Sequence, residues 1–210
     1  MIEDVFKKIS WLGHDGILYQ DTLVLYIDPY DISGGPPADL ILISHDHFDH
    51  CSPEDVKKIQ KPETLILTEP DSAKKLSGRV EILKPGETKT VLGITVEAVP
   101  AYNTNKDFHP KAKGWLGFII SIEGVRLYHP GDADFIPEMK TIQVDIAFFP
   151  VSGTYVMTAK EAAEAAKIMK PRIAVPIHYG AIVGSDKDAQ EFRELLEGEV
   201  EVRILAKEKK

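Results

Sequence analysis

Residues 39–53 read DLILISHDHFDHCSP, an apolar run that ends in three histidines and two aspartates within six positions. The run at 39–44 is almost continuously apolar, which is typical of a strand buried on both faces of its sheet. Ser52 can cap a helix and Pro53 suits its first position, so a helix should begin directly after the histidines. The hexapeptide at 45–50 therefore follows the carboxyl end of a buried strand, where catalytic loops of α/β proteins commonly lie.

The rest of the chain alternates between short apolar runs and helical patterns. Runs bounded by turn residues predict strands at 16–20, 23–28 and 65–70, a series between about 79 and 132, and further strands at 145–153, 173–180 and 200–206. Caps and periodicity predict helices at 71–76, 158–170 and 188–198. A length of 210 residues fits a single domain covering 1–210, of mixed α/β (α+β) class with helices on the outer faces of its sheets.

Composition excludes several functional classes. A net charge of −8 and a pI near 5.4 argue against a broad surface for long nucleic acids. The chain has no run near the ~20 apolar residues that a membrane span needs, and its first residues lack the pattern of a secretory signal. One cysteine, Cys51, rules out an internal disulfide and suits a reducing cytoplasm. We expect a cytoplasmic protein with a small-molecule substrate, and composition leaves a homo-oligomer open.

The seven histidines are placed for metal binding rather than for surface solvation. Besides the three in the hexapeptide, His14, His129 and His178 lie at strand ends or turns beside glycine or proline. Imidazole and carboxylate together suit Zn, Mn, Fe or Ni, and zinc is the ion we expect first. His45 and His47 are two residues apart and so project to the same side, whereas Asp46 should point elsewhere.

HDHFDH resembles the H-x-H-x-D-H signature of the metallo-β-lactamase superfamily. WLGHDG at 11–16, YHPGDAD at 128–134 and PIHYG at 176–180 follow in the order found in that superfamily. Among its branches, the chain is similar to the ascorbate-6-phosphate-lactonase-like enzymes and related metal-dependent hydrolases. The resemblance implies a four-layer αβ/βα sandwich with metals at one edge, between two sheets.

The resemblance also implies a set of ligands. His45 and His47 would bind a first metal, Asp49 and His50 a second, and Asp132 would bridge the two. The second site would be completed by His178. His14 would lie close to the metals as a ligand or as a hydrogen-bond donor, and His129 would orient a ligand or shape the turn before Asp132.

One position departs from the superfamily pattern. Asn103, in VPAYNTN, stands where a third histidine for the first metal is expected. His109, six residues later, could take its place as a metal ligand. Alternatively, Asn103 could bind weakly, or the centre could hold one metal tightly and the other loosely.

These residues predict a metal-dependent hydrolase in which a metal-bound hydroxide attacks an ester, lactone or phosphoester of a small anionic substrate. Asp49 would orient the nucleophile, and His14 or Tyr155 would donate a hydrogen bond to substrate, although Tyr155 also fits ordinary loop packing. Lysines 106, 111 and 113 either attract an anionic substrate or only solvate their loop. The alternatives are a phosphodiesterase or nuclease acting on short nucleic acids, and a catalytically inactive metal-binding protein.

Overall fold

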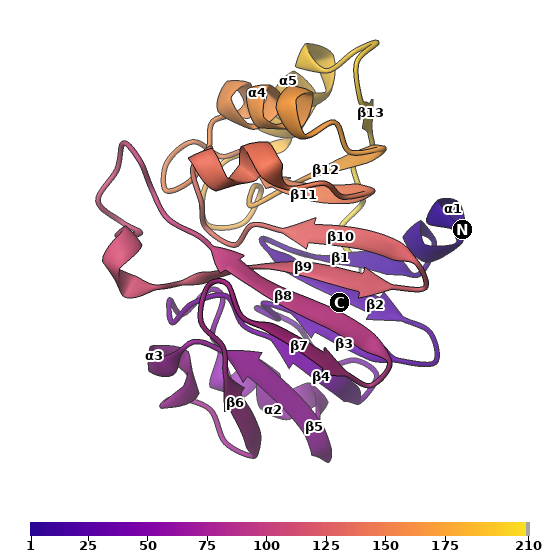
Figure 1. Cartoon of the computed structure of the whole chain (residues 1–210), viewed down its shortest axis with the longest axis vertical. Helices are drawn as coiled ribbons and strands as arrows, with labels where there is room; N and C mark the ends of the chain where they lie inside the picture. Colours follow the sequence, from indigo (N-terminus) through magenta and orange to yellow (C-terminus); the bar gives the residue numbers. More distant parts are fainter. Residues whose placement is uncertain (209–210) are drawn as a thin grey trace.

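Two mixed β-sheets packed face to face form the centre of the computed structural model, which describes residues 1–208 (Figure 1). The first sheet has the order β1 (Ile9–Gly13), β2 (Gly16–Gln20), β3 (Val24–Ile27), β4 (Ala38–Leu42), β5 (Gln60–Thr68), β6 (Arg79–Ile82). The second has the order β13 (Glu201–Val202), β12 (Ile173–Ile177), β11 (Ile146–Pro150), β10 (Val125–His129), β9 (Leu116–Ile122), β8 (Ile94–Pro100), β7 (Thr88–Val91). In each sheet an antiparallel meander continues into parallel strands.

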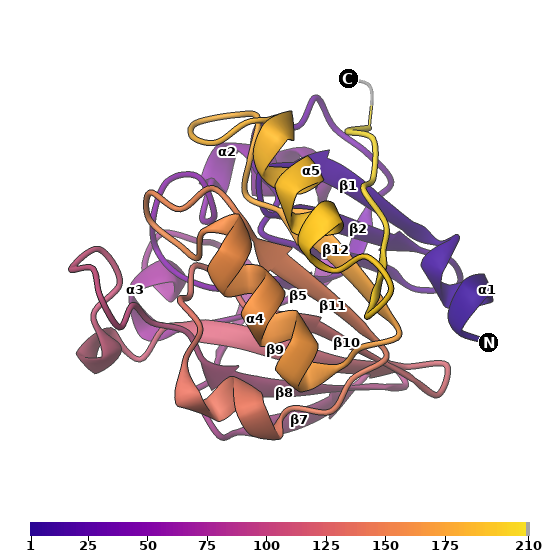
Figure 2. The ribbon, with the colours of Figure 1, turned by 90° about the horizontal axis from the view of Figure 1, so that it is seen from above.

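Helices cover the outer faces of both sheets. The α-helices are α1 (Ile2–Phe6), α2 (Pro53–Ile59), α3 (Pro70–Ala73), α4 (Ala159–Met169) and α5 (Asp186–Leu195), and the 3-10 turns are η1 (Lys111–Lys113) and η2 (Pro137–Thr141). Helices α4 and α5 contact each other and lie over β11 and β12 (Figure 2). The order helix, sheet, sheet, helix confirms the predicted four-layer sandwich. Within residues 1–208, no helix is both long and apolar enough to cross a membrane.

Strand β4 shows why the run before the histidines is continuously apolar. Leu40 and Leu42 are buried between the two sheets. Ile41 and Ile43 point to the other face, in the cluster that includes Val56 of α2. Successive side chains of a strand point to opposite faces, so a strand covered on both sides needs apolar residues at every position.

The predicted helix starts are confirmed by their capping contacts. Ser52 accepts a hydrogen bond from the backbone N–H of Asp55 at the start of α2, with Pro53 in the first turn. At the start of α4, Thr158 and Glu161 form a reciprocal capping box. The helix predicted at 188–198 instead covers Asp186–Leu195 and begins after Ser185.

Several short segments differ from the prediction: α1 was not expected, and the helix expected at 71–76 covers only Pro70–Ala73. The final strand, expected at 200–206, pairs in the second sheet only over Glu201–Val202. The chain then crosses to the first sheet, where the backbone N–H of Glu208 donates to the carbonyl of Trp11. Strand β1, which ends just before His14, was not predicted because WLG lacks a clear alternating pattern.

Candidate metal centre

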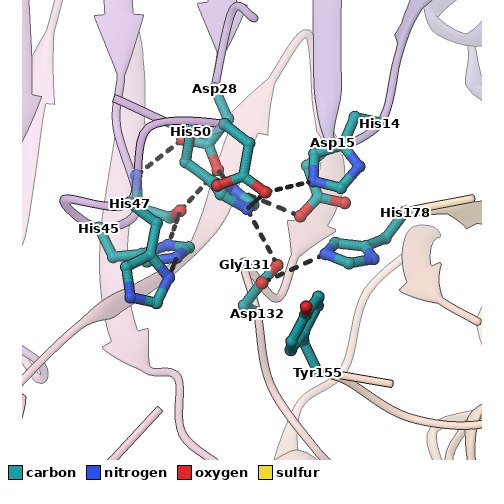
Figure 3. Close-up of polar contacts among 12 residues, drawn as sticks. His14, Asp15, Asp28, His45, His47, His50, Gly131, Asp132, Tyr155 and His178 are labelled. Carbon is teal, nitrogen blue, oxygen red and sulfur yellow. Dashed lines mark hydrogen bonds and ion pairs between the residues drawn. The ribbon is translucent and has the colours of Figure 1, made fainter. Parts of the chain in front are cut away.

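Polar side chains from both sheets meet at one edge of the sandwich, just past the carboxyl ends of several strands (Figure 3). His14 follows β1, Asp28 follows β3 and the hexapeptide follows β4, all in the first sheet. The second sheet supplies Asp132 after β10 and His178 after β12. The structure thus brings together residues that are up to 164 positions apart in the chain (178 − 14).

Three histidines form one half of this cluster, which we call the three-histidine group: His45, His47 and His109. Each offers one ring nitrogen, and these nitrogens lie within 4.8 Å of one another. His45 Nε2 and His47 Nδ1 are 3.0 Å apart. Burial lowers the pKa of His45 well below its ordinary value and also lowers that of His47, so both rings are neutral and carry a lone pair for a metal.

The other half, the mixed group, combines carboxylates with imidazoles. Its members come from four loops: His14, Asp15, Asp49, His50, Asp132 and His178. Potential ligand atoms of His14, Asp49, His50 and His178 lie within 4.8 Å of one another, and so do those of Asp15, His50, Asp132 and His178. His14 Nε2 lies 3.0 Å from Asp49 Oδ2.

Asp132 lies between the two groups. Its Oδ2 is 3.2 Å from His109 Nε2 and 3.2 Å from His178 Nε2, while Oδ1 is 3.3 Å from His50 Nε2. Burial alone would raise the pKa of Asp132, but the charges of His178 and His50, the close approach of His109 and the hydrogen bond with His178 Nε2 hold it well below its ordinary value. An ionised carboxylate at this place can face both groups at once.

In most imidazoles of the cluster, the ring nitrogen that faces away from the site forms a hydrogen bond that fixes the ring. His50 Nδ1 lies 2.9 Å from Asp28 Oδ2, and His109 Nδ1 lies 3.0 Å from Asn103 Oδ1. Hydroxyls serve the other two, because the Nδ1 atoms of His45 and His178 lie within 2.9 Å of Ser44 Oγ and 2.8 Å of Ser152 Oγ. Such contacts are typical of metal-binding histidines, whose orientation they fix.

The polar atoms that face inward fit a metal centre. His50 Nε2, His109 Nε2 and Asp132 Oδ1 are buried, and none has a hydrogen-bond partner within the described chain. Burying polar atoms without partners is costly unless an ion or another group satisfies them. The His/Asp clusters therefore suggest a site for two metal ions.

The backbone at the site adopts conformations that are rare for residues with side chains. His14, Asp28 and His178 have φ values of 52°, 44° and 58°. These left-handed conformations cost energy and persist where surrounding structure enforces them, as at functional sites. Gly131, before Asp132, has φ of 58°, and a Cβ there would lie 2.7 Å from the carbonyl oxygen of Leu116, so only glycine fits.

Comparison with known proteins agrees with this geometry. A family model described as a beta-lactamase superfamily domain matches residues 8–178. A UPF0173 metal-dependent hydrolase of Thermococcus kodakarensis is 30% identical over 94% of this chain and 96% of its own length. The chain belongs to the UPF0173 metal-dependent hydrolases of the metallo-β-lactamase superfamily. It is a metal-dependent hydrolase.

Solved structures show the same fold. A crystal structure described as a metal-dependent hydrolase from Parabacteroides distasonis has a TM-score of 0.85 and 37% identity, covering 94% of this chain and 91% of that one. A protein from Thermotoga maritima, described as a Zn-dependent hydrolase of the metallo-β-lactamase superfamily, has a TM-score of 0.65 at 20% identity, covering 94% of this chain and 97% of its own. The second likeness concerns the fold alone.

The structure brings His109, rather than Asn103, next to His45 and His47. The Asn103 amide is fully used elsewhere: Oδ1 accepts from the backbone N–H of His109, and Nδ2 donates to the carbonyl of Tyr155. That orientation makes Oδ1 the acceptor for His109 Nδ1–H, which leaves His109 Nε2 with the lone pair. Asn103 thus positions His109 from the place where the superfamily pattern has a histidine.

Two other predictions about this UPF0173 chain agree with the contacts. His129 faces backbone, since Nδ1 accepts from the N–H of Gly131 and Nε2 lies 2.9 Å from the carbonyl of Asp15, so it shapes the turn before Asp132. Asp46 points away from the cluster and pairs with Lys75 at 2.9 Å.

The sequence did not predict four polar residues of the site: Asp15, Asp28, Ser44 and Ser152. A local signal existed for some of them, because Asp28 ends an apolar strand and Ser44 directly precedes the hexapeptide. The histidine partners of Asp28, Ser152 and Asp15, however, lie 22, 26 and 35 positions away in the chain, and nothing local reveals such pairings.

Proposed function

We propose that this chain hydrolyses an ester or lactone bond of a small neutral molecule at a centre of two divalent ions. The main support for the proposal is the position of Asp132 between two groups of metal-capable side chains. Four imidazoles of these groups are also fixed by a hydrogen bond at Nδ1. The resemblance to the ascorbate-6-phosphate-lactonase-like enzymes noted above supports a lactone as the bond type, although not a phosphorylated substrate.

The residues divide into two ligand sets. In this proposal, the three-histidine group holds one ion, and His50, Asp132 and His178 hold the other, with Asp15 or His14 within reach. Imidazole donors suit zinc, while the mixed group accepts zinc or a harder ion such as Mn²⁺. When bound, such ions make water acidic enough to act as a nucleophile near neutral pH and stabilise negative charge on the attacked oxygen.

Asp49, hydrogen-bonded to His14, orients the attacking water and takes part in moving its proton. Burial would raise the pKa of Asp49, but the hydrogen bond from His14 and the charge of His50 lower it to about 2, so the carboxylate is ionised at neutral pH. Its oxygens can accept a hydrogen bond from water and aim it at the carbonyl carbon. In the reaction a C–O bond forms from water, the acyl C–O bond breaks, and the proton passes to the leaving alkoxide.

The charges around the site favour a neutral substrate over the anionic one that the sequence predicted. All three lysines near His109 are ion-paired: Lys106 with Asp134 at 2.6 Å, Lys111 with Glu138 at 2.9 Å, and Lys113 with Asp71 at 3.6 Å. They therefore present little uncompensated positive charge to a phosphate or carboxylate.

The test combines metal analysis with hydrolysis. The purified chain is stripped with a chelator, reloaded with Zn²⁺ or Mn²⁺, and assayed by pH-stat on γ-butyrolactones, methyl esters and a bis-aryl phosphodiester. We expect two equivalents of metal and turnover of lactone or ester that falls roughly a hundred-fold or more in His47→Ala. The matched control is Asp46→Asn, one residue away but outside the cluster, which should keep both metal and turnover.

Three results would overturn the proposal. Less than half an equivalent of metal after reloading would exclude the two-ion centre. Faster turnover of the phosphodiester would favour the phosphodiesterase alternative. Full metal loading with no turnover of any substrate would favour an inactive metal-binding protein.

A further inference from the structure

Four aromatic side chains lie on loops that also carry residues of the candidate metal centre or of its supporting contacts, and we call them the aromatic rim: Tyr30, Phe48, Phe108 and Tyr155. They come from four loops, after β3, after β4, between β8 and η1, and after β11. Phe48 is 66% exposed and Phe108 is 51% exposed, and they are the only large exposed aromatic side chains among residues 1–208. Both are directly attached to metal-facing residues, since Phe48 lies between His47 and Asp49, and Phe108 precedes His109.

The rim is organised as two edge-to-face pairs. The rings of Tyr30 and Phe48 have centroids 5.8 Å apart at 80°, and those of Phe108 and Tyr155 are 4.7 Å apart at 85°. The Tyr30 ring also lies 6.2 Å from that of His14, which ties the first pair to the mixed group. Figure 3 draws Tyr155 on the Asp132 and His178 side of the cluster, and its carbonyl accepts from Asn103, which ties the second pair to His109.

Contact between these apolar rings and water is unfavourable, and the packing of the core does not require either ring to be exposed. Phe48 and Phe108 belong to neither hydrophobic core cluster. Apolar side chains gathered on the surface mark sites that bind a partner or ligand. Here the gathered side chains are rings, and the nearby lysines are neutralised by carboxylates.

We propose that the aromatic rim binds a flat aryl group of the substrate, next to the bond that the metal centre cleaves. The inference rests on the proposed ester or lactone hydrolysis and names its substrate class: neutral esters or lactones that carry an aryl substituent. Aromatic rings pair with an aryl group edge-to-face or offset-stacked, beyond simple burial of apolar area. Exposed rings directly next to His47 and His109 in the chain can contact such a group without a deep pocket.

The experiment compares three lactones that differ only in one substituent: γ-phenyl-, γ-cyclohexyl- and γ-methyl-γ-butyrolactone. The acyl group and ring are shared, so differences in kcat/KM report binding of the substituent. With the metal-loaded chain we expect the phenyl lactone to be preferred over the cyclohexyl lactone by about ten-fold, as expected of two ring contacts. In the double variant Phe48→Leu, Phe108→Leu, which keeps apolar bulk but removes both rings, this ratio should fall to about two-fold.

Leu92→Ser is the matched control. Leu92 is 57% exposed and lies in the turn between β7 and β8; the seven residues of β8, which span about 20 Å, separate it from the loop that carries Asn103. This variant should keep the wild-type ratio. Sedimentation of the wild type and the double variant is measured alongside.

The possible outcomes distinguish failure of the aromatic-rim proposal from failure of the hydrolase proposal. Turnover without a phenyl preference, or a preference that survives the double variant, would overturn the rim proposal and leave the hydrolase proposal intact. No turnover of any lactone or ester would overturn both. A dimer that the double variant abolishes, without a change in the ratio, would assign the rim to contact with a second copy of this chain.

Discussion

The three-histidine group and the mixed group lie side by side, yet the protein lowers the pKa of two histidines in the first group and raises the pKa of two in the second. Burial lowers the pKa of His45 and His47. Burial acts on His50 and His178 too, but there the charge of Asp132 prevails, raising the pKa of His50 well above its ordinary value and that of His178 to about 9. His50 and His178 therefore favour a positive charge even without an ion, whereas His45 and His47 offer neutral lone pairs. Within the mixed group, His14 is the exception, because burial lowers its pKa.

This contrast indicates that the two groups favour different metal ions. A site of neutral imidazoles selects its ion by ligand softness and geometry, while carboxylates add charge attraction that suits harder ions. Asp132 is the only carboxylate that contacts histidines of both groups within the described residues. The two groups should thus be separable by substitution everywhere except at Asp132.

The largest effect is expected from Asp132→Asn. The amide keeps the size but removes the negative charge that faces His50, His109 and His178, so both metals should be weakened and kcat should fall roughly a thousand-fold. Metal content by mass spectrometry and kcat on the preferred lactone provide the measurement, with circular dichroism to confirm folding. If the variant kept two tightly held metals, the two groups would not share Asp132.

A smaller effect should distinguish the two groups. Asn103→Ala removes the acceptor that orients His109, and Ser152→Ala removes the hydroxyl beside His178. Each should weaken one metal by about ten- to a hundred-fold and leave the other almost unchanged. Titration with a competing chelator measures both affinities, and equal losses at both metals in either variant would contradict the division.

The smallest effect on metal binding is expected at Cys51, which directly follows His50 but faces the core. Burial raises the pKa of its thiol to about 11, and its Sγ lies 4.0 Å from the carbonyl of Ser72. Because a raised pKa keeps the thiol protonated below that value, at pH 8 Cys51 should react with a disulfide reagent about a hundred-fold more slowly than in the unfolded chain. The same slow rate is expected with and without metal, and protection that appears only on metal loading would instead place Cys51 among the ligands.

Local patterns in the sequence predicted most of the elements and the nucleus of the site. The apolar run of β4, the cap at Ser52 and the capping box at Thr158 all depend on residues within four positions of one another. The pair His45 and His47 is equally local, because residues two apart in extended chain project to one side. Periodicity and capping are short-range physics, so these parts could be read from the chain.

Only the tertiary structure decided how the centre is completed. It placed His109 rather than Asn103 beside His45 and His47, and it brought Asp15 beside Asp132 and Ser152 beside His178. The first two of these contacts join loops of different sheets, and the relative position of the sheets depends on a shared core that includes Leu40 and Leu42. Nothing in the local spacing of a sequence records which strand ends meet across a packed core, because that depends on burial of apolar surface summed over both sheets.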